Sequence, residues 1–118
     1  MKITHEFELG GETVTGRCTF RAINAFEQES GVSIPEAWDM LSRSKLPFSI
    51  LARAVWAFIN GERVFNGKQP ESYNVIGEKM HQEHFVKFTG VAGQFFLMSV
   101  PSSDKPSVED APEKKSSE

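Results

Sequence analysis

The sequence predicts an α+β fold, in which an N-terminal β-hairpin packs on a mainly α-helical body of four to five helices and a disordered tail follows. Apolar and polar residues alternate over roughly the first twenty positions, and the apolar spacing then becomes helical. All thirteen aromatic residues lie between Phe7 and Phe96. We therefore expect one domain over residues 1–100 and a disordered tail over residues 101–118.

Residues 3–20 are expected to form the hairpin. Apolar side chains alternate with polar ones along both runs, at Ile3, Phe7 and Leu9 and then at Val14, Cys18 and Phe20. Gly10-Gly11 between the runs is typical of a two-residue turn with positive φ. This turn places Phe7 opposite Val14. It also places Ile3 opposite Cys18, on the same apolar face.

Capping signals and apolar spacing predict the helices. The first begins near Phe20 and ends at Gly31, and the second begins with the capping box Ser33-x-x-Glu36. The third is expected from Pro47 to Asn60-Gly61 and is followed by a loop over 62–69. A fourth helix is expected to begin at Pro70, and a last helix is expected over 83–98. Whether the last two are continuous stays open. Helical stripes assign four aromatic residues to the core, namely Trp38, Phe85, Phe88 and Phe95.

The third predicted helix carries the candidate partner-binding residues. It is apolar on nearly all sides, and its polar residues Ser49, Arg53 and Asn60 fall on one narrow stripe together with Trp56. Phe65 follows in the predicted loop, beside charged neighbours. Because exposed aromatic side chains often mark protein contacts, Arg53, Trp56 and Phe65 are candidates for partner binding. A core role for the aromatic residues is the alternative.

Composition argues against several other classes of function. The net charge of −3 disfavours phosphate neutralisation and hence nucleic-acid binding. The longest apolar stretch, over 48–59, is too short to span a bilayer, and the N-terminus lacks a signal-peptide pattern. With a single cysteine no internal disulfide is expected, so the sequence indicates a cytoplasmic protein.

Little in the sequence points to catalysis. His81 and His84 can share a helix face, but a zinc site needs further ligands. Cys18 alternates with polar residues on the predicted apolar face, which indicates a core position rather than a reactive thiolate. The sequence therefore predicts no catalytic residues, no metal and no cofactor.

Residues 3–61 resemble the tail assembly chaperones of long-tailed bacteriophages and their relatives in prophages and gene transfer agents. The resemblance lies in the hairpin with its threonine-rich second strand, the segment FRAINAFEQESGVSIPEAWDMLSRS, and the apolar helix over 48–59. It implies a non-enzymatic protein in the cytoplasm of the bacterial host. Its partners would be the tape measure protein and the tail tube protein, with self-association left open.

The resemblance also implies a second, longer product made by ribosomal frameshifting, and Glu113-Lys114-Lys115 is compatible with an A-rich slippery sequence. Two alternatives remain. One is a structural phage tail protein, such as a tail tube or tail-completion subunit. The other is a small regulatory domain that binds DNA, which the acidic charge balance disfavours.

Overall fold

The computed structural model describes residues 3–100. The strands are β1 (Thr4–Leu9) and β2 (Glu12–Arg17), and the helices are α1 (Phe20–Ser30), α2 (Ile34–Ser42), α3 (Phe48–Phe65), α4 (Tyr73–His81), the 3-10 helix η1 (Phe85–Phe88) and α5 (Thr89–Ser99). The predicted α+β class, with an N-terminal hairpin on a helical body, is confirmed. The predicted tail over 101–118 lies outside the described residues.

The hairpin has the predicted turn and register. Gly10 and Gly11 adopt positive φ angles of 62° and 80°, which a glycine reaches without steric cost. Phe7 pairs with Val14. The Cys18 amide donates to the Ile3 carbonyl at 2.8 Å, so the pairing continues to the end of the hairpin.

The first two helices are capped largely as predicted. The Thr19 hydroxyl accepts from the Ala22 amide at 3.0 Å, so α1 begins at Phe20. Gly31 ends α1 in the left-handed conformation, at φ 75°. Ser33 and Glu36 form the predicted capping box at the start of α2. The prediction that Phe20 continues the apolar face of the hairpin is wrong, because this side chain starts a helix and is 82% exposed.

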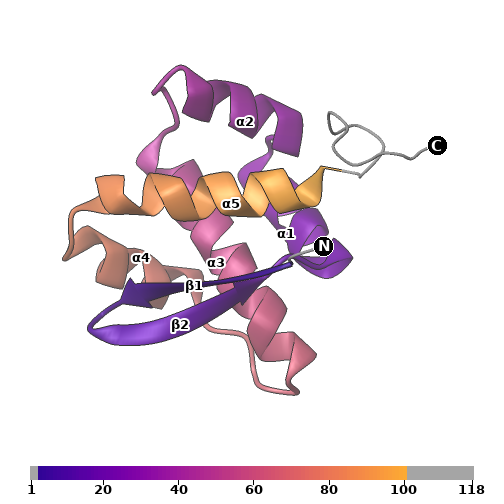
Figure 1. Cartoon of the computed structure of the whole chain (residues 1–118), viewed down its shortest axis with the longest axis vertical. Helices are drawn as coiled ribbons and strands as arrows, with labels where there is room; N and C mark the ends of the chain where they lie inside the picture. The colour runs from indigo at the N-terminus through magenta and orange to yellow at the C-terminus, as the bar shows by residue number, and fades with distance from the viewer. Residues whose placement is uncertain (1–2, 101–118) are drawn as a thin grey trace, which may run out of the picture.

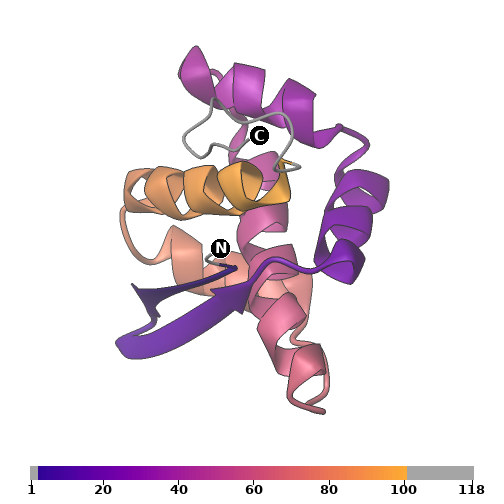
Figure 2. The same cartoon turned by 45° about the vertical axis from the view of Figure 1, so that its right-hand side comes forward.

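Helix α3 runs through the centre of the molecule and contacts β2, α1, α4 and α5 (Figures 1 and 2). Most of its residues from Leu51 to Gly61 are buried, as predicted. The predicted end at Asn60-Gly61 is wrong, because α3 continues to Phe65 and the loop begins after it. Gly61 is a contact residue instead: a Cβ there would lie 2.1 Å from the Arg17 carbonyl oxygen.

The last two predicted helices are separate. Helix α4 begins at Tyr73, later than the predicted Pro70, because the Ser72 hydroxyl caps it by accepting from the Val75 amide at 3.2 Å. After α4 ends, the Glu83 carboxylate accepts from the Gly10 amide at 2.6 Å. This bond ties the connecting loop to the hairpin turn, and the chain then forms η1 before α5.

The predicted aromatic core is half correct. Phe88 and Phe95 are fully buried, as are Phe26, Phe58 and Phe96. Trp38 and Phe85 are not core residues, with exposed fractions of 44% and 42%. On α2 the small residue Ala37, rather than Trp38, faces the body beside Ile34. Phe85 lies in η1, where it packs edge-on against Phe48 at a centroid distance of 5.2 Å.

Candidate functional site

Two residues of the predicted stripe on α3, Arg53 and Trp56, form a cluster with Tyr73. The Arg53 guanidinium lies 4.8 Å from the centre of the Trp56 ring and 3.6 Å from that of the Tyr73 ring. Trp56 and Tyr73 meet edge-on, with ring centroids 6.4 Å apart. Both Arg53 and Trp56 are half-buried. The structure therefore brings these two predicted residues together through Tyr73, at the start of α4.

This stripe attaches the segment before α4 to α3. Asn60 donates to the Glu71 carbonyl at 3.0 Å and accepts from the Glu71 amide at 2.7 Å. The Tyr73 hydroxyl donates to the Ser49 carbonyl at 3.1 Å. Because a buried amide needs such partners, these bonds account for a buried asparagine on an otherwise apolar helix. Asn60 thus has a structural role, and Trp56 is half-buried against Tyr73.

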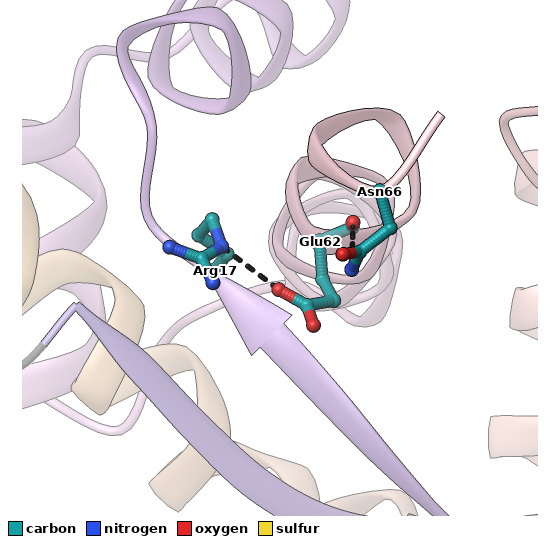
Figure 3. Close-up of polar contacts among 3 residues, drawn as sticks. All are labelled: Arg17, Glu62 and Asn66. Carbon is teal, nitrogen blue, oxygen red and sulfur yellow. Dashed lines mark hydrogen bonds and ion pairs between the residues drawn. The ribbon is translucent and has the colours of Figure 1, made fainter. Parts of the chain in front are cut away.

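Phe65 belongs to a different surface, about 13 Å further along α3 than Trp56. Its ring is 62% exposed, and the Arg17 guanidinium lies 3.7 Å from the ring centre. The Arg17 guanidinium forms an ion pair with the Glu62 carboxylate, with Nε and Oε1 2.8 Å apart (Figure 3). The Glu62 backbone carbonyl accepts a hydrogen bond from the Asn66 side-chain amide at 3.0 Å. Phe65 is exposed as predicted, but it ends a helix rather than lying in a loop.

An open apolar groove, which the sequence did not predict, lies between α1, α2 and the C-terminal end of α5. Its hollow measures about 400 Å³ and is lined by Ile23, Glu27, Ile34, Pro35, Trp38, Leu97, Ser99 and Val100. Trp38 and Leu97 keep 44% and 47% of their surfaces exposed. The volume is within the range of about 300–1,000 Å³ that ligand sites usually have. Large side chains with this exposure, set around a hollow, are typical of a binding surface.

One sequence signal could have indicated this groove. Helix α5 has more large apolar residues than a single buried face accommodates, since Phe95, Phe96 and Leu97 follow one another directly. Phe95 and Phe96 are fully buried, so Leu97 points to the surface. On α2, likewise, Ala37 is fully buried and the adjacent Trp38 points to the surface.

The charged groups at the groove are acidic. Glu27 accepts from the Ile34 amide through Oε2 at 2.8 Å, and within residues 3–100 no other hydrogen bond or ion pair involves its carboxylate. Glu36 does not line the hollow but lies at the same end of α2, where hydrogen bonds from the backbone amide and the side chain of Ser33 lower the pKa of its carboxyl group. No lysine or arginine of residues 3–100 lines the hollow.

Within residues 3–100, Cys18, His81 and His84 do not form a metal-binding group. Cys18 is buried, and this burial raises the pKa of its thiol, while a contact with the Ser99 hydroxyl at 3.4 Å acts in the opposite direction. A raised pKa disfavours the reactive thiolate. Over residues 3–100, neither His81 nor His84 belongs to a group of three or more side chains suited to hold a metal ion.

No family model, curated protein or solved structure matches this chain. Among the helices of residues 3–100, none has the length and apolar character that crossing a membrane requires. At the surface of the molecule, the groove and the exposed aromatic residues Phe20 and Phe65 are the principal apolar features.

Proposed function

We propose that this protein is a non-enzymatic tail assembly chaperone of a long-tailed bacteriophage, a prophage or a gene transfer agent. In this proposal it acts in the cytoplasm of the bacterial host. It binds apolar helical segments of the tape measure protein, keeps that protein soluble, and assists assembly of the tail tube around it. The family resemblance of residues 3–61 motivates the proposal.

The observation that carries the proposal is the apolar groove between α1, α2 and α5. An amphipathic helix binds by placing its apolar face into such a groove, with anchors at i, i+3 or i+4, and i+7. Trp38 and Leu97 expose large apolar surfaces at this groove, so they are available to a partner helix without unfolding of the core.

Affinity capture from a host that expresses the neighbouring tail genes tests the proposal. The tagged full chain is expected to retain a long helical tail protein, and its co-expression is expected to increase the soluble fraction of that protein. An unrelated tagged protein of similar size and charge is the control. Failure to enrich any tail protein over this control would refute the proposal. Rings or tubes formed by the chain alone, together with its presence in finished particles, would instead identify a structural tail protein.

The same capture experiment tests the residues predicted on α3. Trp56→Ala and Phe65→Ser baits are expected to retain less client than the wild-type chain, because each substitution removes an aromatic contact surface. Arg53→Gln extends the test to the cation that lies over Trp56. A folded variant that captures the client as well as the wild-type chain removes its residue from the binding site.

A further inference from the structure

We propose that the groove between α1, α2 and α5 binds an amphipathic helix of a partner protein that carries a lysine or arginine beside its apolar stripe, with this cation next to Glu27. The inference rests on the proposed function, and it specifies the location of the site and the charge of the client segment.

The shape and lining of the groove favour a helix that is apolar on one side. Ile23, Ile34 and Val100 line its wall, while Trp38 and Leu97 are large and partly exposed. Closing this surface would remove the exposed parts of both large side chains from water, which favours binding. Anchors of leucine size on a partner helix would supply the complementary surface.

The sign of the charge at the groove favours a cation on the partner. The N-terminus of α2 and the C-terminus of α5 both border the hollow, and their half-charges of opposite sign largely offset each other. The carboxylate of Glu27 remains, and no lysine or arginine of residues 3–100 lines the hollow. A groove with net negative charge attracts a positively charged segment and disfavours an acidic one.

A lysine or arginine suits this position better than a small cation does. The long aliphatic part of either side chain can lie along apolar residues while its charged end reaches a carboxylate. Glu27 offers such a carboxylate, because only Oε2 is used within residues 3–100, by the Ile34 amide. Trp38, which is partly exposed and lines the same groove, is the type of side chain that favours cation–π contact with such a cation.

The remaining part of this chain is a poor occupant on the same chemistry. Residues 101–118 follow directly after Val100, which lines the groove. They contain Val108 and Ala111 as their only aliphatic residues apart from proline, and five acidic residues against three lysines. Their apolar surface is small and their net charge has the same sign as Glu27. A separate basic, amphipathic helix matches the groove on both counts.

Binding of synthetic peptides to the full chain tests the inference. Three fluorescein-labelled 18-residue helices share one leucine stripe and flank it with lysine, glutamine or glutamate. Fluorescence anisotropy is expected to give the order lysine, glutamine, glutamate from tightest to weakest. Equal affinities, or tighter binding of the glutamate peptide, would overturn the inference.

Substitutions in the full chain separate the groove from general attraction to an acidic protein. Glu27→Gln keeps an oxygen that can accept from the Ile34 amide but removes the charge. It is expected to lower the affinity for the lysine peptide by roughly threefold to fivefold and to reduce the salt dependence of that binding. The affinity for the glutamine peptide is expected to stay the same. Glu78→Gln, which removes an exposed carboxylate on α4, is the control for net charge. Equal effects of the two variants would contradict a site at Glu27.

The apolar part of the site has its own matched pair. Leu97→Ser at the groove is expected to weaken all three peptides by at least fivefold, since it removes a large apolar side chain that is 47% exposed. Val86→Ser on η1 removes an apolar side chain that is 64% exposed and does not line the groove, so it is expected to leave binding unchanged. No difference between these variants would place the site elsewhere.

Two further outcomes identify other occupants and would overturn the inference. Self-association of the full chain that Leu97→Ser abolishes would make a second copy the occupant. An increase of tenfold or more in peptide affinity on Val108→Asp would show that residues 101–118 occupy the groove. Capture of the tape measure protein that neither Glu27→Gln nor Leu97→Ser weakens would refute the inference but leave the proposed function intact. Failure of the wild-type chain to capture any tail protein would refute the proposed function whatever the peptides show.

Discussion

The contact between α3 and β2 is closed at Gly16 and Gly61, whereas the apolar groove between α1, α2 and α5 is open. At the closed contact, glycines remove the side chains that would separate the two elements. A Cβ at Gly16 would lie 2.3 Å from the Phe58 ring, and one at Gly61 would lie 2.1 Å from the Arg17 carbonyl oxygen. Strand and helix therefore approach each other closely at these two glycines.

At the groove, the lining residues within residues 3–100 include large apolar side chains and no glycine. Trp38 and Leu97 are among its lining residues, and each leaves almost half of its surface exposed. Caps at Thr19, Gly31 and Ser33 define both ends of α1 and the start of α2. The difference indicates that helices with well-defined ends can still leave apolar surface free for a partner.

The largest expected effect compares two aromatic residues that the sequence assigned to the core. Phe95→Ala is expected to lower the free energy of unfolding by about 3–5 kcal/mol, because the side chain is fully buried and its removal leaves a cavity. Trp38→Ala is expected to cost about 1 kcal/mol, since the ring is already 44% exposed. Urea denaturation of both full-length variants measures the difference. Equal losses would show that the groove is closed in solution.

A second comparison concerns two helical glycines. Gly61→Ala is expected to lower the free energy of unfolding by about 1–3 kcal/mol, because the new methyl group would collide with the Arg17 backbone. Gly77→Ala in α4 meets nothing within 4 Å and is expected to raise it by about 0.5–1 kcal/mol. Opposite signs in thermal or urea unfolding would confirm that only Gly61 is required for close approach. A stabilised Gly61→Ala protein would contradict the close contact of α3 with β2.

Features set by neighbouring residues could be predicted from the sequence, whereas features set by distant contacts could not. The Gly10-Gly11 turn and the Ser33 capping box depend on residues a few positions apart, and both are confirmed. Gly61 resembles a helix end locally, but α3 continues through it, and its missing side chain makes room for the backbone of Arg17, which is distant in the sequence.

The groove escaped prediction for a related reason. Helical spacing alone does not say which of two adjacent apolar residues faces the body. On α2 the choice falls on Ala37 because α5 packs closely there, and Trp38 is left at the surface. A bulky residue beside a small one on an apolar helix is thus an ambiguous signal until the partner helix is known.

The smallest expected effect concerns the turn of the hairpin at Gly10-Gly11. A hydrogen bond to the Glu83 carboxylate attaches this turn to the helical body. Glu83 accepts from the Lys87 ammonium and from the Gly10 amide, and these hydrogen bonds lower the pKa of its carboxyl group. A lowered pKa means that the folded protein favours the ionised form. The stabilisation is therefore present above the unfolded value of about 4.3 and is lost as the pH falls through the lower folded value.

Glu83→Gln is accordingly expected to narrow the gap in melting temperature between neutral and acidic pH. At neutral pH the variant should melt slightly below the wild-type protein, because an amide oxygen is a weaker acceptor than a carboxylate. Near pH 3 the two should converge, since the carboxyl group of the wild-type protein is then increasingly protonated. Glu78→Gln removes an exposed carboxylate of α4 and serves as the control. If Glu83→Gln and Glu78→Gln change the pH dependence equally, the bond to Gly10 does not hold the hairpin turn in solution.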